Sequence, residues 1–149
     1  MSFQEKNAYA ALAKTILIFG YFAFRMVQFH LDGRLAGPEA ASLVGKSFLV
    51  LMAAAIVAYI VLTILFDIGF AIAQKDPKPD FTVDERDRLI ELKGMRAFLA
   101  IFVMGFVASM AALALGATPV AALLAMIFAM FLGALADDIA KLYHYRRGF

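Results

Sequence analysis

Five charged side chains lie in or beside long apolar runs of the sequence, and they are its first candidates for chemistry: Lys14, Asp67, Arg96, Asp137 and Asp138. Burying such groups among apolar residues is unfavourable, so they usually carry a function or a partner of opposite charge. The carboxylates could form a proton or cation relay, or the opposite charges could simply pair. We favour pairing, because transport sites usually lie at the membrane midplane, whereas these residues lie near the ends of their runs.

Arg25 also interrupts an apolar run, with Gln28, His30 and Asp32 close to it in sequence. Its planar guanidinium suits a lipid phosphate or the carboxylate of a partner protein. It could equally extend along its helix to reach the headgroups and water. Both interpretations remain open at this point.

Cysteine and the recognisable motifs of common enzyme chemistry are missing from the sequence. It contains no cysteine, and therefore no disulfide, thiolate nucleophile or cysteine metal site. Its two histidines, His30 and His144, are predicted to lie on opposite sides of a membrane and so cannot share a metal. No Gly-rich phosphate loop, His-Glu metal motif or Gly-x-Gly-Asp protease signature is present. We expect no enzymatic activity, no cofactor and no metal.

The composition is that of an integral membrane protein. Of 149 residues, 64% are hydrophobic and 17% are charged, and the mean hydropathy is +0.83. Soluble domains contain about 45–50% apolar and about 25% charged residues. The net charge of only +2 gives little reason to expect nucleic-acid binding.

The charge-free runs predict an all-α integral membrane protein with four transmembrane helices, arranged as two helical hairpins. A span needs about 20 apolar residues; residues 47–66 provide 20 without a charge, and residues 97–136 provide 40. Gly116, Thr118 and Pro119 divide the longer run, since they suit a helix end, an N-cap and a first turn. The predicted single membrane domain has spans at about 9–31, 44–73, 96–116 and 119–143, with a loop at 74–95.

The first span is less uniform than the others and could be a signal peptide, with Lys6 as its charged start and residues 15–24 as its apolar core. No small-x-small cleavage site follows, because Arg25, Gln28 and Phe29 come next. A retained signal-anchor helix is therefore the preferred interpretation.

The distribution of basic residues predicts the orientation. Eleven Lys and Arg residues fall on the side of the termini and the 74–95 loop, against two, Arg34 and Lys46, on the other side. Cytoplasmic loops carry the excess of positive charge. Both termini and the 74–95 loop are expected to be cytoplasmic, which suits a bacterial inner membrane.

A charged segment before the third span predicts a short amphipathic juxtamembrane helix. Thr82 and Glu85 have the spacing of a capping box, so the helix should begin near residue 83. We call its charged residues the collar: Asp84, Glu85, Arg86, Asp87, Arg88 and Glu91. The acidic face could meet Lys141, Arg146 and Arg147 of the C-terminal tail, or the collar could bind a soluble partner; a divalent-cation site is less favoured, since no Gly-containing loop is present.

Small residues recur every fourth position in the last span, at Ala121, Ala125, Ala129 and Gly133. Such rows let two helix backbones approach closely. Tyr59 and Thr63 continue the same spacing to Asp67 in the second span and predict a polar stripe there. The row of small residues suggests a tightly packed helix contact, within the chain or in a homo-oligomer or larger membrane complex.

The opening Met-Ser-Phe-Gln-Glu-Lys of residues 1–6 and the run Asp-Glu-Arg-Asp-Arg-Leu-Ile-Glu-Leu-Lys-Gly of residues 84–94 resemble an uncharacterised family of small bacterial four-helix inner-membrane proteins. The resemblance implies four spans with cytoplasmic ends, and it supplies no catalytic or ligand residues. Our leading hypothesis is a non-enzymatic accessory or interaction subunit whose collar engages a partner. The alternative is a small proton- or cation-coupled transporter or channel that uses Asp67 and Asp138.

Overall fold

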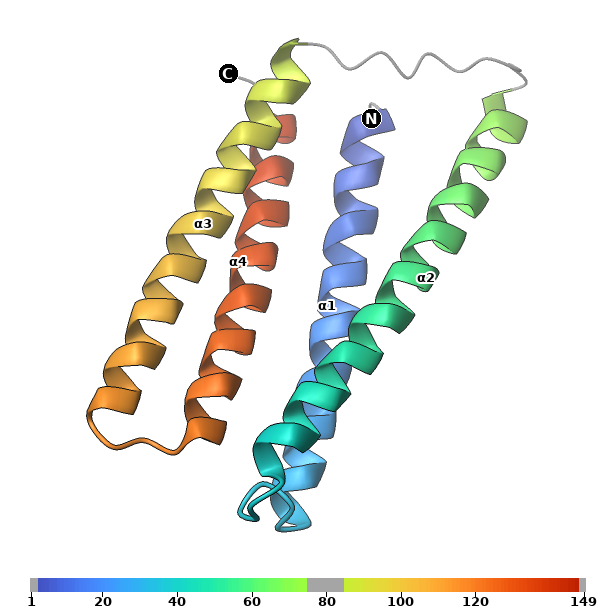
Figure 1. The fold of residues 1–149 in the computed structure, drawn as a ribbon. Coiled ribbons are helices and arrows are strands. Elements are labelled where there is room, and N and C mark those ends of the chain that lie inside the picture. The colour runs from blue at the N-terminus through green and yellow to red at the C-terminus, as the bar shows by residue number, and fades with distance from the viewer. Residues whose placement is uncertain (1–2, 75–84, 148–149) are drawn as a thin grey trace.

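The computed structural model describes the backbone of residues 3–74 and 85–147 and the side chains of residues 7–65, 68–69 and 85–147. The described parts form four α-helices and no strand: α1 (Phe3–Leu31), α2 (Ala40–Gln74), α3 (Glu85–Ala114) and α4 (Pro119–Arg147). In Figure 1 the start of α1 and the end of α4 lie at the same end of the molecule, which we call the terminal end. The 32–39 and 115–118 connections lie at the opposite end, the loop end.

All four helices are long and apolar enough to cross a membrane. A helix rises 1.5 Å per residue, so even the shortest of them exceeds the roughly 30 Å of a hydrocarbon core. Three of the predicted spans lie inside one helix each, and the third, 96–116, runs two residues past the end of α3 at Ala114. Helices α1, α3 and α4 extend further at their charged terminal ends. The fold is therefore an all-α transmembrane bundle.

The predicted turn between the last two spans is confirmed in detail. Gly116 has a φ of 92°, a left-handed conformation that favours glycine. The amide of Ala117 donates to the carbonyl of Ala112 at 2.9 Å, which closes the end of α3. The Thr118 hydroxyl accepts from the Ala121 amide at 3.3 Å, and Pro119 begins α4.

Helix α4 is the centre of the bundle. It has its most extensive contact with α3, a smaller one with α1 and a limited one with α2. Helix α2 also contacts α1 only to a limited extent, and no residue in its most apolar 18-residue window is buried. In Figure 1, α2 lies against α1 near the loop end and diverges from it toward the terminal end.

Phenylalanines join α1, α2 and α4 near the loop end. Phe22 of α1 is fully buried, and its ring lies 5.7 Å from that of Phe131 and 6.2 Å from that of Phe48. Phe19 adds an edge-to-face contact with Phe128 at 5.5 Å. These centroid distances are in the favourable range for aromatic pairs, and the rings fill the space between the three helices.

Helices α3 and α4 are held together differently, by small residues that allow close backbone approach. A Cβ added at Gly105 would collide with Ala129, and one at Gly133 would lie 3.0 Å from the carbonyl oxygen of Phe98. Ala129 and Gly133 of the predicted row are therefore in the α3–α4 contact. Ala121 and Ala125 are exposed. A row with four-residue steps turns by about 40° at each step, because a helix has 3.6 residues per turn, so it leaves the contact after one or two steps.

The juxtamembrane segment is not separated from the third span. Residues 85–94 are the first turns of α3, and the helix continues through Gly94 without a break. Gly94 is buried against α4, where an added Cβ would collide with Asp137 Oδ1 and lie 2.8 Å from Lys141 Cε. Close helix packing, not a bend, explains the glycine at this position. Asp84 and Thr82 lie outside the described residues.

Candidate functional site

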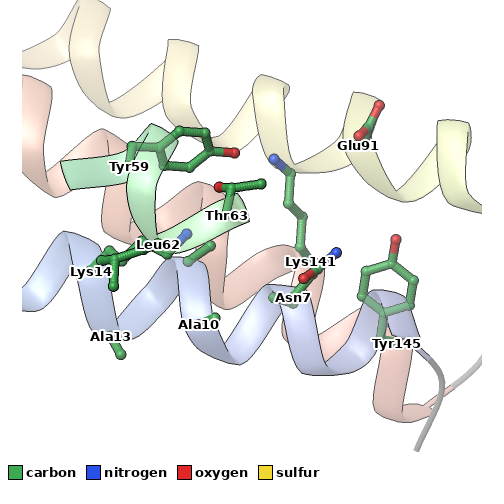
Figure 2. A pocket seen from close by; sticks show the side chains of 12 residues that line it. Asn7, Ala10, Ala13, Lys14, Tyr59, Leu62, Thr63, Glu91, Lys141 and Tyr145 are labelled. Carbon is green, nitrogen blue, oxygen red and sulfur yellow. The ribbon is translucent and has the colours of Figure 1, made fainter. Parts of the chain in front are cut away.

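A pocket with a volume of about 480 Å³ opens at the terminal end and is lined by all four helices. Figure 2 shows its polar groups: Tyr59 and Thr63 come from α2, Glu91 from α3, Lys141 and Tyr145 from α4, and Lys14 from α1. Alanines of α1, including Ala10 and Ala13, form one wall. The divergence of α2 leaves this space open, and the small side chains of α1 do not fill it.

Among the described side chains, Lys14 contacts an aromatic ring and forms no ion pair with a carboxylate. Its ammonium lies 4.3 Å from the centroid of the Tyr59 ring, a cation–π contact that stabilises a partly desolvated charge. Tyr59 belongs to the polar stripe predicted in the second span, and Thr63 of the same stripe also lines the pocket. The two described residues of the stripe therefore line the same pocket as Lys14.

Asp137 pairs with Lys141 one turn along the same helix, with 2.8 Å between Lys141 Nζ and Asp137 Oδ2. Both side chains are partly buried. The second oxygen, Asp137 Oδ1, is buried beside Gly94 and makes no hydrogen bond within the described part of the chain. The pair neutralises a charge that lies in the α3–α4 contact.

Asp138 points in another direction, toward α1. The Thr15 hydroxyl donates a hydrogen bond of 2.7 Å to Asp138 Oδ2, and Asp138 is only 7% exposed. A hydrogen bond to a charged acceptor in a buried place is stronger than one between neutral groups. This contact ties the central helix to α1.

The five charged residues expected to cluster are thus brought together only in part. Lys14, Asp137 and Asp138 lie at the terminal end with separate partners, whereas Arg96 is exposed on α3. The side chain of Asp67 lies outside the described residues. The roles of Thr15 and Tyr145 at this site were not predicted. No local sequence pattern indicates these roles, because the partners of both residues lie on other helices.

The described collar residues, from Glu85 to Glu91, lie on the first turns of α3, which contact α4. Ile90 is 0% exposed, and the Tyr145 hydroxyl of α4 makes a hydrogen bond with the Asp87 carboxylate. Of the tail arginines, Arg146 is exposed, and Arg147 donates to the Tyr143 hydroxyl of its own helix at 2.9 Å. Glu85, Arg86, Arg88 and Glu91 are exposed.

Arg25 lies toward the loop end, far along α1 from Lys14. Its guanidinium donates to the side-chain oxygen of Gln28 at 3.0 Å and lies 4.8 Å from the centre of the Phe29 ring. Both partners are on its own helix and neither carries a charge.

The chemistry available at the terminal end is binding and charge pairing. Among the described residues, no group of three or more His, Asp or Glu side chains could hold a metal ion. The fold and the site together define the protein as a multi-pass helical membrane protein with a polar pocket at one end. Comparison of the chain with protein-family models, curated proteins and solved structures gives no match. Its function must therefore be argued from its own residues.

Proposed function

We propose that this protein is a non-enzymatic accessory or interaction subunit of a bacterial inner membrane, and that its collar engages a partner protein. The observation that carries the proposal is that four collar residues, Glu85, Arg86, Arg88 and Glu91, are exposed on a helical segment that packs against α4. Buried Ile90 and the Asp87–Tyr145 hydrogen bond fix the first turns of α3 on α4. A surface fixed in this way loses little conformational entropy when a partner binds.

Exposed leucines beside the charges support a protein partner. Leu89 is 50% and Leu92 45% exposed, next to the exposed Arg88. The 30 residues of α3 span about 45 Å, roughly 15 Å more than the hydrocarbon core, so its charged end extends beyond the core. Leucines flanked by arginines at that height suit a partner helix with an apolar face and acidic edges.

We also propose that the four helices form two helical hairpins in the membrane. One hairpin consists of residues 3–31 and 40–74, and the other of residues 85–114 and 119–147. Residues 85–94 act as the juxtamembrane element. The limited packing of α2 supports assembly into a homo-oligomer or a larger membrane complex, since its apolar surface is nearly all exposed.

The first prediction tests the orientation. A reporter fused after Phe149, or inserted within residues 76–80, is expected to register as cytoplasmic, and one inserted within residues 37–41 as external. The reason is the excess of Lys and Arg at the terminal end. Paired alkaline phosphatase and fluorescent-protein fusions provide the measurement. An external C-terminus would refute the four-span topology.

The second prediction tests the collar. A photo-crosslinking amino acid at Leu89 is expected to give one protein adduct in native membranes, identified by mass spectrometry. Arg88→Glu should abolish this adduct because it reverses the charge beside the leucine, and Arg146→Glu should not, because Arg146 is exposed at the same end outside the collar.

The control position for the crosslinker is Leu115, which is 88% exposed at the loop end. If Leu89 gives only the adducts that Leu115 gives, or if both charge reversals act alike, the collar is not a specific docking surface and the proposal fails.

The alternative function is a small proton- or cation-coupled transporter or channel that uses Asp67 and Asp138. One observation favours it: Asp138 is a buried carboxylate inside a candidate span, and such residues often belong to proton pathways.

A further inference from the structure

A second polar pocket lies between α1 and α2 near the loop end, away from the collar and from the pocket at the terminal end. Its volume is about 400 Å³, and its polar lining consists of Arg25, Lys46, Ser47 and Tyr21. No carboxylate lines it. Two cations that share a cavity without an acid favour an anionic ligand.

Arg25 is oriented but not neutralised. Gln28 accepts one of its hydrogen bonds at 3.0 Å, and the Phe29 ring lies beneath the guanidinium at 4.8 Å. Within the described residues Arg25 forms no ion pair. Part of its planar fork therefore stays available for a group such as phosphate, which accepts two parallel hydrogen bonds.

The other side of the same pocket is apolar and is lined by Val50, Leu51 and Ala54 of α2. Val50 and Ala54 are exposed, so this apolar side is open at the surface of α2. The pocket therefore combines two positive charges with an open hydrocarbon surface. Its chemistry matches an amphiphile with an anionic head.

Arg25 and Lys46 also lie at a similar depth, measured from the helix ends at the loop end. Arg25 is six residues before the end of α1, and Lys46 is six residues after the start of α2. At 1.5 Å per residue both are about 9 Å from the helix ends. Long basic side chains at this depth reach the headgroup region.

We propose that this pocket binds an anionic phospholipid from the leaflet at the loop end, with its phosphate on Arg25 and Lys46 and an acyl chain along Val50 and Ala54. Basic pockets between transmembrane helices are suited to lipid headgroups. A free phosphate would meet the same two cations but would leave the apolar side of the pocket without a ligand.

Native mass spectrometry of the full chain in mild detergent tests the site with phosphatidylglycerol and phosphatidylcholine as probes. The wild type is expected to retain phosphatidylglycerol preferentially. Arg25→Gln and Lys46→Gln should each weaken retention about tenfold, since each removes a charge-assisted hydrogen bond. The double variant should not distinguish the two lipids.

Arg96→Gln is the control, because Arg96 is an exposed arginine of α3 that does not line the pocket, whereas Arg34 contacts the same Phe29 ring as Arg25. The Arg96→Gln variant should bind phosphatidylglycerol like the wild type. Arg25→Lys keeps the charge and should recover part of the binding, and melting in detergent verifies that each variant is folded. Equal retention of both lipids by the wild type, or undiminished retention by a folded double variant, would overturn the proposal.

A separate arm distinguishes lipid from free phosphate. Ala54→Phe should obstruct the apolar side of the pocket and weaken phosphatidylglycerol retention while both cations remain. Inorganic phosphate in millimolar excess should leave the lipid in place. Full displacement by phosphate, together with no effect of Ala54→Phe, would assign the site to a soluble anion and refute the lipid proposal.

Discussion

Gly105→Leu is expected to separate α3 from α4 and to lower the stability of the bundle by about 3 kcal/mol or more. Even a single Cβ at this position would collide with Ala129, so a leucine would force the two backbones apart. The contact that would be lost is the most extensive in the molecule. Thermal melting in detergent, followed by circular dichroism or by loss of the monodisperse peak, provides the measurement.

Two matched substitutions make this test specific. Gly20→Leu places the same side chain where nothing lies within 4 Å, so it should melt like the wild type. Ala129→Leu should destabilise strongly, whereas Ala125→Leu, one turn earlier on the same helix and exposed, should not. Wild-type melting of both Ala129→Leu and Ala125→Leu would show that the row of small residues faces lipid and would contradict the α3–α4 contact.

The second large effect is expected at Asp138. Asp138→Ala removes the acceptor of the Thr15 hydrogen bond at 2.7 Å and should lower the free energy of unfolding by about 2 kcal/mol. Thr15→Val should also destabilise, because it leaves the buried carboxylate without its donor. If the two groups act as a pair, the double variant should be no less stable than the worse single variant. Full additivity would show that the two side chains do not interact.

The same residue separates the two proposed functions. Asp138→Asn retains an oxygen that can accept from Thr15, but the amide cannot release a proton. For an accessory subunit we expect it to fold normally, and wild-type proteoliposomes loaded with a pH dye should show no proton uptake. Proton uptake by the wild type that disappears in a stable Asp138→Asn variant would instead establish transport.

The helices and the turn that could be predicted from the sequence are those that depend on residues close together in the chain. Long charge-free runs predict helices because a span must be apolar over its whole length, and four such helices are present. The turn at Gly116, Thr118 and Pro119 follows from conformational preferences of single residues, and each acts as predicted.

The partners of the buried charges could not be predicted in this way. Asp137 and Asp138 are adjacent in sequence, yet one pairs along its own helix with Lys141 and the other reaches across to Thr15. Successive side chains differ by 100° around a helix, so neighbours face different surroundings. Lys14 meets Tyr59 because of the rotation and crossing point of α1 and α2, which the sequence does not reveal.

The central position of α4 has a consequence for how the protein is made. Helices enter the membrane in chain order, so α1, α2 and α3 are synthesised before the helix against which each of them packs. Until α4 arrives, α1 and α2 share only a limited contact, and the small-residue surface of α3 has no counterpart. Biogenesis therefore proceeds through an intermediate of loosely associated helices, and the bundle becomes a unit only when its fourth helix has been inserted.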